Sequence, residues 1–420
     1  LMSGVMLKTA IYGLLRVSFD LLHIQVWWWG VIALSVGLIT ALFGVLFAAV
    51  QTDMKRLLAY SSIENVGIVL AGGGLTILFH SYDMNVLATL ALAATLYHCL
   101  NHALFKSLLF LVTGSVMHAT SHRSLGKLGG LIRHMPWVAA AGLIGTLAIA
   151  GLPPLNGFAS EWMLFQAFLL SPSLPNSYLS MLVPVATAAL ALAVAVAGYV
   201  MVKFYGVVFL GLPREEGAQA HDAGPWERAG LLWLAIWCIL LGLLPVFVVT
   251  AMDPIARALV GATLEDSMQE SSWWFLTAFR PERASYSALL FLLGIVLTVL
   301  VSYLLVRRFY HGRVRRSAAW DCGYGGLDAR MQDSAEGFGQ PVKQIFEPLF
   351  KLERSQPSPF DARPVYRSKI EDRIWYWVYV PVIKAAEQLS SLVGILHHGR
   401  IHLYLIYSFA TLLALLLLIQ

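Results

Sequence analysis

Residues 98–106 read HCLNHALFK and lie inside an apolar run that covers residues 85–116. His98, His102 and Lys106 follow one another in steps of four residues. On an α-helix they therefore drift across only about 80° of one face and rise about 12 Å along the axis. A charged side chain at the centre of a bilayer costs about 3 kcal/mol on insertion scales, so ionisable groups there usually have a function. The pattern favours a proton path.

The composition is typical of a polytopic helical membrane protein. The 420 residues are 58% hydrophobic and only 13% charged, whereas soluble domains carry about 25% charged residues. Apolar runs of about 20 residues, the length that spans a bilayer as a helix, recur along the chain. The net charge of +5 is small for this length and indicates no nucleic-acid partner.

We predict an all-α polytopic membrane protein with about nine transmembrane spans. The expected spans are about 2–18, 28–50, 57–79, 85–116, 136–170, 178–211, 231–252, 287–306 and 401–419. Basic loops fall at alternate connections, which are 55–56, 123–133, 203–214 and 307–384. The positive-inside rule therefore puts these loops in the cytoplasm, with Leu1 inside and Gln420 outside.

The expected fifth span, 136–170, is too long for one straight crossing of a core about 30 Å thick. Its centre reads GLPPLNGF, and Pro153 and Pro154 each remove a backbone donor, so we predict a break in this helix. Glu161 follows in the first turn of the second half, where the helix dipole favours an anion. Glu161 is therefore a second candidate proton site, and a purely dipolar role is the alternative.

Four other ionisable side chains lie in or near the expected spans, and they are Lys8, Arg16, Glu64 and Lys203. Lys8 is too central in its span to reach the interface and is expected to face a polar interior, where a relay role is favoured and pairing with an acid for stability is the alternative. Arg16 lies near the end of the same span and is able to snorkel. For Lys203, a relay role and simple snorkelling both stay open. Glu64, near the start of the third span, is a secondary candidate.

Two other interpretations of the row of ionisable residues formed by His98, His102 and Lys106, here called the file, stay open. In one, the two histidines are merely hydrogen-bonded and Lys106 pairs with a nearby acid. In the other, the His-x3-His spacing binds zinc, but Lys106 is a poor ligand and no local cysteine or acid completes the set. We predict no metal. Because histidine titrates near neutrality and a buried lysine readily loses its proton, proton conduction is favoured.

Several motifs in chain order resemble the Mrp-type antiporter subunits and the related proton-pumping membrane subunits of respiratory complex I and membrane-bound hydrogenases. They are LKTAIYGLLR at 7–16, QTDMKRLLAYS at 51–61, HCLNHALFK at 98–106, and LPP at 152–154 through Glu161. The resemblance covers about residues 1–250 closely. SSIENVG at 61–67 and WDCGY at 320–324 are similar to the hydrogenase-4 and formate hydrogenlyase branch.

The resemblance implies the second half of an antiporter-like helix bundle. In it, Lys8 would be the central relay lysine, Lys106 the lysine midway to the exit, and Glu161 the terminal ionisable group. His98 and His102 would be relay partners. The family carries an earlier, inverted copy of this half-channel, so the chain is expected to lack its N-terminal part. Some relatives place lysine where Glu161 stands.

The implied function is proton translocation by a subunit of a redox complex in a prokaryotic inner membrane. The expected partners are other membrane subunits of a hydrogenase or complex I-like assembly, the lipid bilayer, and protons or Na⁺. No haem, flavin, nucleotide or iron–sulfur motif is visible in the sequence, so we expect no cofactor, and any redox catalysis would belong to the complex. One alternative is a Na⁺(K⁺)/H⁺ antiporter, alone or as a subunit, and another is a structural membrane scaffold.

The same reasoning divides the chain into four segments. Residues 1–252 would form a partial antiporter-like proton-translocation domain, and 253–308 an outside loop with one additional span. Residues 309–398 would form a basic, amphipathic cytoplasmic extension, and 399–420 the last transmembrane helix.

Overall fold

A computed structural model describes most of the chain. The described residues are 2–23, 26–170, 174–214, 220–264, 274–277, 285–310, 317, 320–355, 357–358, 360–361, 367–394, 397 and 399–419. Contacts divide the chain into two compact units, Leu1–Pro341 and Val342–Gln420. Leu1 and Gln420 themselves, for which sides of the membrane were predicted, lie outside the described residues.

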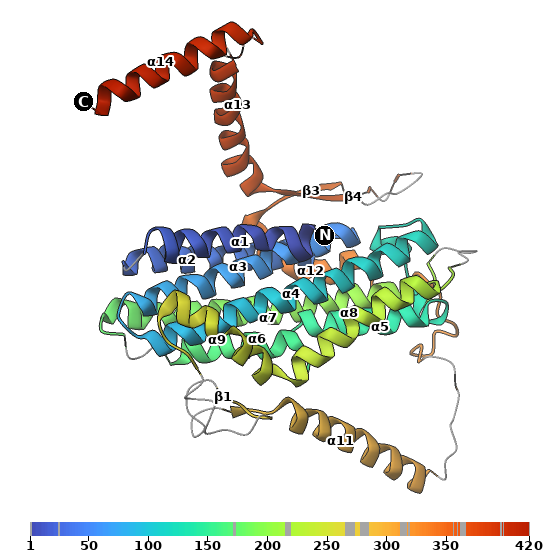
Figure 1. The fold of residues 1–420 in the computed structure, drawn as a ribbon. Coiled ribbons are helices and arrows are strands. Elements are labelled where there is room, and N and C mark those ends of the chain that lie inside the picture. Colours follow the sequence, from blue (N-terminus) through green and yellow to red (C-terminus); the bar gives the residue numbers. More distant parts are fainter. Residues whose placement is uncertain are drawn as a thin grey trace. The chain divides into compact units, whose positions relative to one another are not determined.

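The first unit is a bundle of helices (Figure 1). Its long helices are α2 (Trp27–Val50), α3 (Met54–His80), α4 (Asn85–Thr120), α7 (Ser177–Phe209), α8 (Pro225–Leu243) and α11 (Ala288–Phe309). Its shorter elements are η1 (Met2–Met6), α1 (Leu7–Leu15), η2 (Arg16–Leu21), η3 (Leu125–Lys127), η4 (Leu131–Arg133), α5 (Pro136–Ile149), α6 (Asn156–Leu169) and α9 (Pro245–Val260). Strands β1 (Leu276–Thr277) and β2 (Ser285–Tyr286) form one antiparallel pair.

Helix α12 (Ala335–Ile345) begins at the end of the first unit. The elements that follow it are η6 (Glu347–Leu349), β3 (Phe350–Ser355), β4 (Arg367–Asp372), η7 (Trp375–Tyr379), α13 (Val380–Gly394) and α14 (Ile401–Ile419). Strands β3 and β4 pair antiparallel. The predicted segment boundaries after residues 252, 308 and 398 stay predictions.

The all-α polytopic class is confirmed. Within the described ranges, seven helices are long and apolar enough to cross a membrane, namely α2, α3, α4, α7, α8, α11 and α14. The other two expected spans are built from shorter pieces. The first is η1, α1 and η2 in succession, and the fifth is α5 followed by α6.

The chain breaks at the Pro-Pro step as predicted. Helix α5 ends at Ile149 and α6 begins at Asn156, with Gly151 in the left-handed region at φ +61°. A second break was missed. The expected single span 231–252 is α8 followed by α9, because Pro245 has no N–H to continue α8 and instead starts the next helix.

Helices α2 and α3 pack backbone against backbone. A Cβ on Gly37 or on Gly67 would lie 2.4 Å from a main-chain nitrogen of the facing helix. Gly44 lies about two turns beyond Gly37, and a Cβ there would meet the main-chain nitrogen of Glu64 at 2.3 Å. Small residues permit this close approach in membrane proteins, where van der Waals packing holds helices together. The α2 packing therefore positions the polar side chains at the start of α3.

Candidate functional site

The file of three ionisable residues points into the protein. His98, His102 and Lys106 lie on one face of α4 and are at most 1% exposed. Helix α4 packs against α3 and α6 on its sides and against η1 at the start of the chain. These neighbours supply the polar groups that the file contacts, since lipid offers no hydrogen bonds to a buried lysine or histidine.

Lys8 on α1 reaches the middle of the file. Its Nζ lies 2.5 Å from Nδ1 of His102, a residue 94 positions away, and donates to the carbonyl of Ser3 at 2.7 Å. An ammonium group only donates, so while Lys8 is charged the His102 Nδ1 accepts and the ring proton is on Nε2. That Nε2 is buried and has no hydrogen-bond partner among the described residues.

Lys106 contacts the first turns of α3. Its Nζ donates to the carbonyl of Leu58 at 2.9 Å and forms a hydrogen bond with the Ser61 hydroxyl. Glu64 lies one turn further along α3 and is 2% exposed. Its carboxyl group interacts electrostatically with Lys106 and with Glu161. Glu64 is thus a buried carboxyl group on the α3 segment that contacts Lys106, although the sequence made it only a secondary candidate.

His98 connects α3 to α6. Its Nε2 lies 3.1 Å from Oδ1 of Asn65, and its Nδ1 lies 3.1 Å from the hydroxyl of Ser160. The Asn65 amide nitrogen donates to the carbonyl of Ser61 at 2.8 Å, which turns the amide oxygen toward the histidine. Because that oxygen only accepts, Nε2 of His98 carries a proton. The Ser160 hydroxyl also lies 3.0 Å from the carbonyl of Gly157. The histidine is held between two helices.

Glu161 lies against the break in the long span. It is 7% exposed, and a Cβ on Gly151 would lie 2.2 Å from its Oε2. Only a glycine leaves room for the carboxyl group at this left-handed position. On the other side of the break, a Cβ on Gly242 of α8 would lie 2.2 Å from the carbonyl oxygen of Pro154. The non-helical backbone is therefore enclosed by protein, as expected for a broken helix at membrane depth.

Two of the secondary candidates lie apart from this cluster. Arg16 forms an ion pair with Asp20 on its own helix, and its side chain is 57% exposed. Lys203 on α7 is fully buried and donates to the carbonyls of Ala49 at 2.8 Å and Gln51 at 2.5 Å. Since Gln51 follows the last residue of α2, Lys203 binds the C-terminal end of that helix, where a cation is favoured.

The sequence reasoning missed the neutral residues that join the charged ones. Asn65 and Ser160 hold His98, and Ser61 holds Lys106. Asn101 links α4 to α6, because its amide donates to the carbonyl of Asn156 at 2.7 Å and to the Ser160 hydroxyl at 3.1 Å. Carboxamides inside apolar runs were the available signal, since such groups need partners within the protein.

Comparison with known proteins shows which proteins the chain is similar to. Residues 1–191 match the family described as NADH:quinone oxidoreductase/Mrp antiporter, TM. The chain is 36% identical to Hydrogenase-4 component B of Escherichia coli (strain K12), over 99% of this chain and 63% of that protein. It is also 36% identical to Formate hydrogenlyase subunit 3 of the same organism, over 84% of this chain and 55% of that protein.

A solved structure shares the fold. One chain of the membrane-bound sulfane sulfur reductase (MBS), an archaeal respiratory membrane complex, has a TM-score of 0.62 and 25% sequence identity. The match covers 92% of this chain and 56% of that chain. The protein described here thus spans between half and two thirds of the length of these relatives. These matches confirm the resemblance that the motifs predicted.

Proposed function

We propose that the chain is a proton-translocating membrane subunit of a respiratory-type redox complex of the hydrogenase-4 and formate hydrogenlyase kind. The observation that carries this proposal is the contact between Lys8 Nζ and His102 Nδ1, at 2.5 Å. It joins α1 to α4 through two groups that both exchange protons. Two relatives are named as parts of hydrogenase systems, which supports the type of complex.

The proposed path runs laterally through the bundle. A proton reaches Lys8, passes to His102, and moves along the α4 face by way of Lys106, His98 and internal water. It leaves through Glu161. Repulsion between the charges on neighbouring lysines, switched by redox events in partner subunits, drives the steps. His102 Nε2 and Glu64 Oε2 are buried and have no hydrogen-bond partner in the described part of the chain, which favours ordered water in this region.

The proposal also assigns a location and partners. The protein would lie in the inner membrane of a prokaryote with its basic loops in the cytoplasm. Other membrane subunits of the assembly would surround it, and the redox centres would belong to those partners or to soluble subunits. Protons are the proposed cargo.

The test is the variant Glu161→Gln in the assembled complex, which keeps the shape of the side chain and removes its proton exchange. We expect proton translocation per electron transferred to fall by about tenfold or more, while the amount of assembled complex is unchanged. Arg16→Gln is the matched control, because Arg16 pairs with Asp20 and lies apart from the cluster. Normal translocation by assembled Glu161→Gln and Lys106→Ala complexes would overturn the relay and favour a scaffold role.

A Na⁺(K⁺)/H⁺ antiporter is the second candidate. The family description includes Mrp antiporters, and the carboxyl groups of Glu64 and Glu161 are both buried. Carboxylate oxygens are the ligands that hard cations prefer. Proteoliposomes that contain only this polypeptide decide between the two, because robust cation/H⁺ exchange there would contradict a function that depends on redox partners.

A further inference from the structure

The hydroxyl group of Ser160 on α6 lies among hydrogen-bonding groups of two helices. Its oxygen is 3.1 Å from Nδ1 of His98 and 3.1 Å from the amide nitrogen of Asn101, which are both on α4. It is also 3.0 Å from the carbonyl oxygen of Gly157 on its own helix, and a contact of 3.4 Å to the carbonyl of Asn156 is longer. Because Ser160 is fully buried, these neighbours decide where its proton points.

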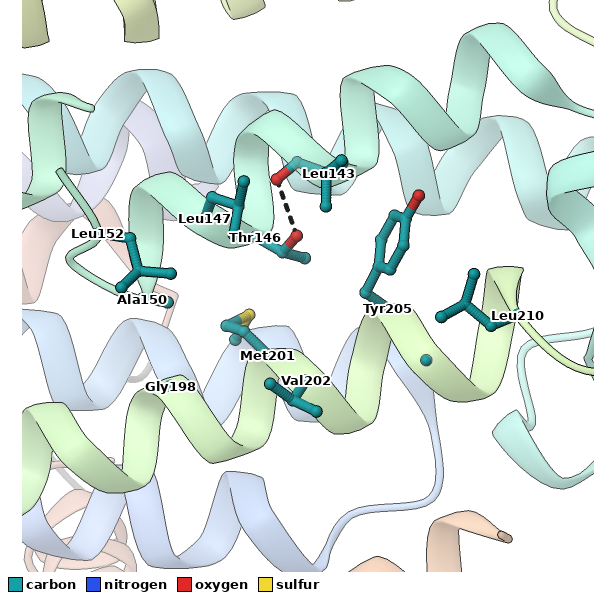
Figure 2. Close-up of a pocket in the computed structure, with 11 residues that line it drawn as sticks. Leu143, Thr146, Leu147, Ala150, Leu152, Gly198, Met201, Val202, Tyr205 and Leu210 are labelled. Atoms are coloured by element: carbon teal, nitrogen blue, oxygen red, sulfur yellow. Dashed lines mark hydrogen bonds between the residues drawn. The ribbon is translucent and has the colours of Figure 1, made fainter. Parts of the chain in front are cut away.

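A nearby hydroxyl shows the ordinary arrangement. Buried serines and threonines on helices commonly bond back to a carbonyl of the preceding turn. Thr146 on α5 does so, since its hydroxyl donates to the carbonyls of Gly142 and Leu143 at 2.9 Å, and Figure 2 shows the second of these bonds. Ser160 differs, because a histidine nitrogen lies about as close to its oxygen as the carbonyl of its own helix. A histidine nitrogen accepts or donates according to its protonation.

The number of protons limits how the bonds around Ser160 are arranged. The amide nitrogen of Asn101 only donates, so the hydroxyl accepts one bond from it. The hydroxyl has a single proton to donate, and Nδ1 of a neutral His98 competes for it with the carbonyl of Gly157. The other ring nitrogen of His98 already carries a proton toward Asn65. The charge of His98 therefore decides which acceptor the hydroxyl binds.

We propose that Ser160 is a positioning residue whose hydroxyl takes two orientations and so lets His98 hold and release a proton at Nδ1. When the ring is neutral, the hydroxyl donates to Nδ1. When Nδ1 gains a proton, Nδ1 donates to the hydroxyl oxygen, and the hydroxyl turns its own proton to the carbonyl of Gly157. One proton moves onto the ring, and Ser160 keeps its own.

This role rests on the proposed proton path, in which His98 passes a proton on. Without the hydroxyl, a protonated Nδ1 would lose its acceptor, and a neutral Nδ1 would lose its donor. The first loss is the larger, because hydrogen bonds of charged groups are stronger than those between neutral groups. Removal of the hydroxyl should therefore favour the neutral ring and lower the proton affinity of His98.

Charged and titratable groups on the neighbouring elements also influence His98. Lys8 interacts with it electrostatically, and His102 follows one turn later on the same helix. The groups to be kept the same in every variant are Lys8 on α1, Glu64 on α3, His102 and Lys106 on α4, and Glu161 on α6. A change that follows the Ser160 substitution alone is then an effect of the hydroxyl.

The first test titrates His98 in the complete complex, reconstituted in lipid with ¹⁵N-labelled histidine. Solid-state NMR separates charged from neutral imidazole, and the His98 signal is the one that His98→Gln removes. Ser160→Ala should lower the proton affinity of His98 by about tenfold, because a charged hydrogen bond is lost. Ser160→Cys should lower it less, since a thiol donates and accepts more weakly. Thr146→Val is the matched control, because its hydroxyl bonds carbonyls of its own helix, and it should titrate as wild type.

The second test follows proton translocation by the same variants as a function of pH. We expect the profile of Ser160→Ala to shift by about one pH unit toward acid, since a higher proton concentration is then needed to charge His98. Loss of a merely structural contact would instead lower the rate alike at every pH. Thr146→Val should keep the wild-type profile.

Three results would each overturn the role of Ser160. They are an unchanged His98 titration in both Ser160→Ala and Ser160→Cys, a rise in proton affinity in either variant, and a wild-type His98 that stays neutral at every pH at which the complex is intact. Normal translocation by Glu161→Gln would instead refute the proton path itself. The NMR titration needs no translocation, so the two failures are distinguishable.

Discussion

Two fully buried lysines occupy membrane helices of this protein, and their surroundings differ. Lys106 on α4 contacts Ser61 and interacts with the carboxyl group of Glu64, so it lies among groups that exchange protons or bind water. Lys203 on α7 contacts the carbonyls of Ala49 and Gln51 at the end of α2. Carbonyls only accept hydrogen bonds and do not pass protons on. The hydrogen bonds of Lys203 to these carbonyls hold the end of α2, so the burial of a lysine is by itself weak evidence for a relay.

The largest expected effect separates the two lysines by function. Lys106→Met should lower proton translocation by about a hundredfold, because it removes the proton-exchanging group and keeps the length of the side chain. Lys203→Met should leave translocation per assembled complex within about twofold. The measurement is proton uptake into vesicles at a matched content of assembled complex. Equal losses in both variants would contradict the distinction.

The next prediction tests whether the close packing of α2 against α3 supports the region around Lys106. Gly44→Ala should lower the free energy of unfolding by about 1–3 kcal/mol, because its Cβ would lie 2.3 Å from the main-chain nitrogen of Glu64 and force α3 away from α2. Gly73→Ala is the control, since a Cβ there meets nothing within 4 Å. Thermal unfolding in detergent measures both. Equal melting temperatures for the two variants would show that the close packing is not required.

Lys203 itself should matter for stability. Lys203→Met leaves one buried and one part-buried carbonyl at the end of α2 without this donor, which costs about 1–3 kcal/mol. Thermal unfolding of the variant should therefore begin at a lower temperature than in wild type. Lys203→Arg should recover most of the loss, because a guanidinium group also donates to carbonyls. A variant with wild-type stability and impaired translocation would instead make Lys203 part of the relay.

The smallest expected effect concerns a neutral neighbour. Ser61→Ala removes one hydrogen bond to Lys106 and leaves the bond to the carbonyl of Leu58 at 2.9 Å. We expect the rate of proton translocation to fall by about threefold, which corresponds to the net free energy that one hydrogen bond contributes. Ser61→Thr, which keeps the hydroxyl, should restore most of the rate. An effect as large as that of Lys106→Met would make Ser61 an obligatory member of the path.

Much of the fold followed from local physical chemistry. The long apolar runs predicted the spans, and the double proline predicted the break between α5 and α6, because two successive prolines remove two backbone donors from the helix. A proline also ends α8 at Pro245, but the sequence analysis missed this break. The residues around Pro245 are uniformly apolar, so no polar residue marked the end of the helix. The four-residue spacing of His98, His102 and Lys106 also fixed which face of α4 would be polar.

The contacts of that face depended on the three-dimensional packing. The sequence could not pair Lys8 with His102 across 94 residues, nor could it choose between a relay and a helix-end role for Lys203. It also gave no weight to Asn65 and Ser160, which hold His98 between α3 and α6. Spacing along one helix is a local property that the sequence determines by itself. Which groups meet across helices is decided only when α1, α3, α4 and α6 pack, because each buried donor or acceptor must then find its partner inside the protein.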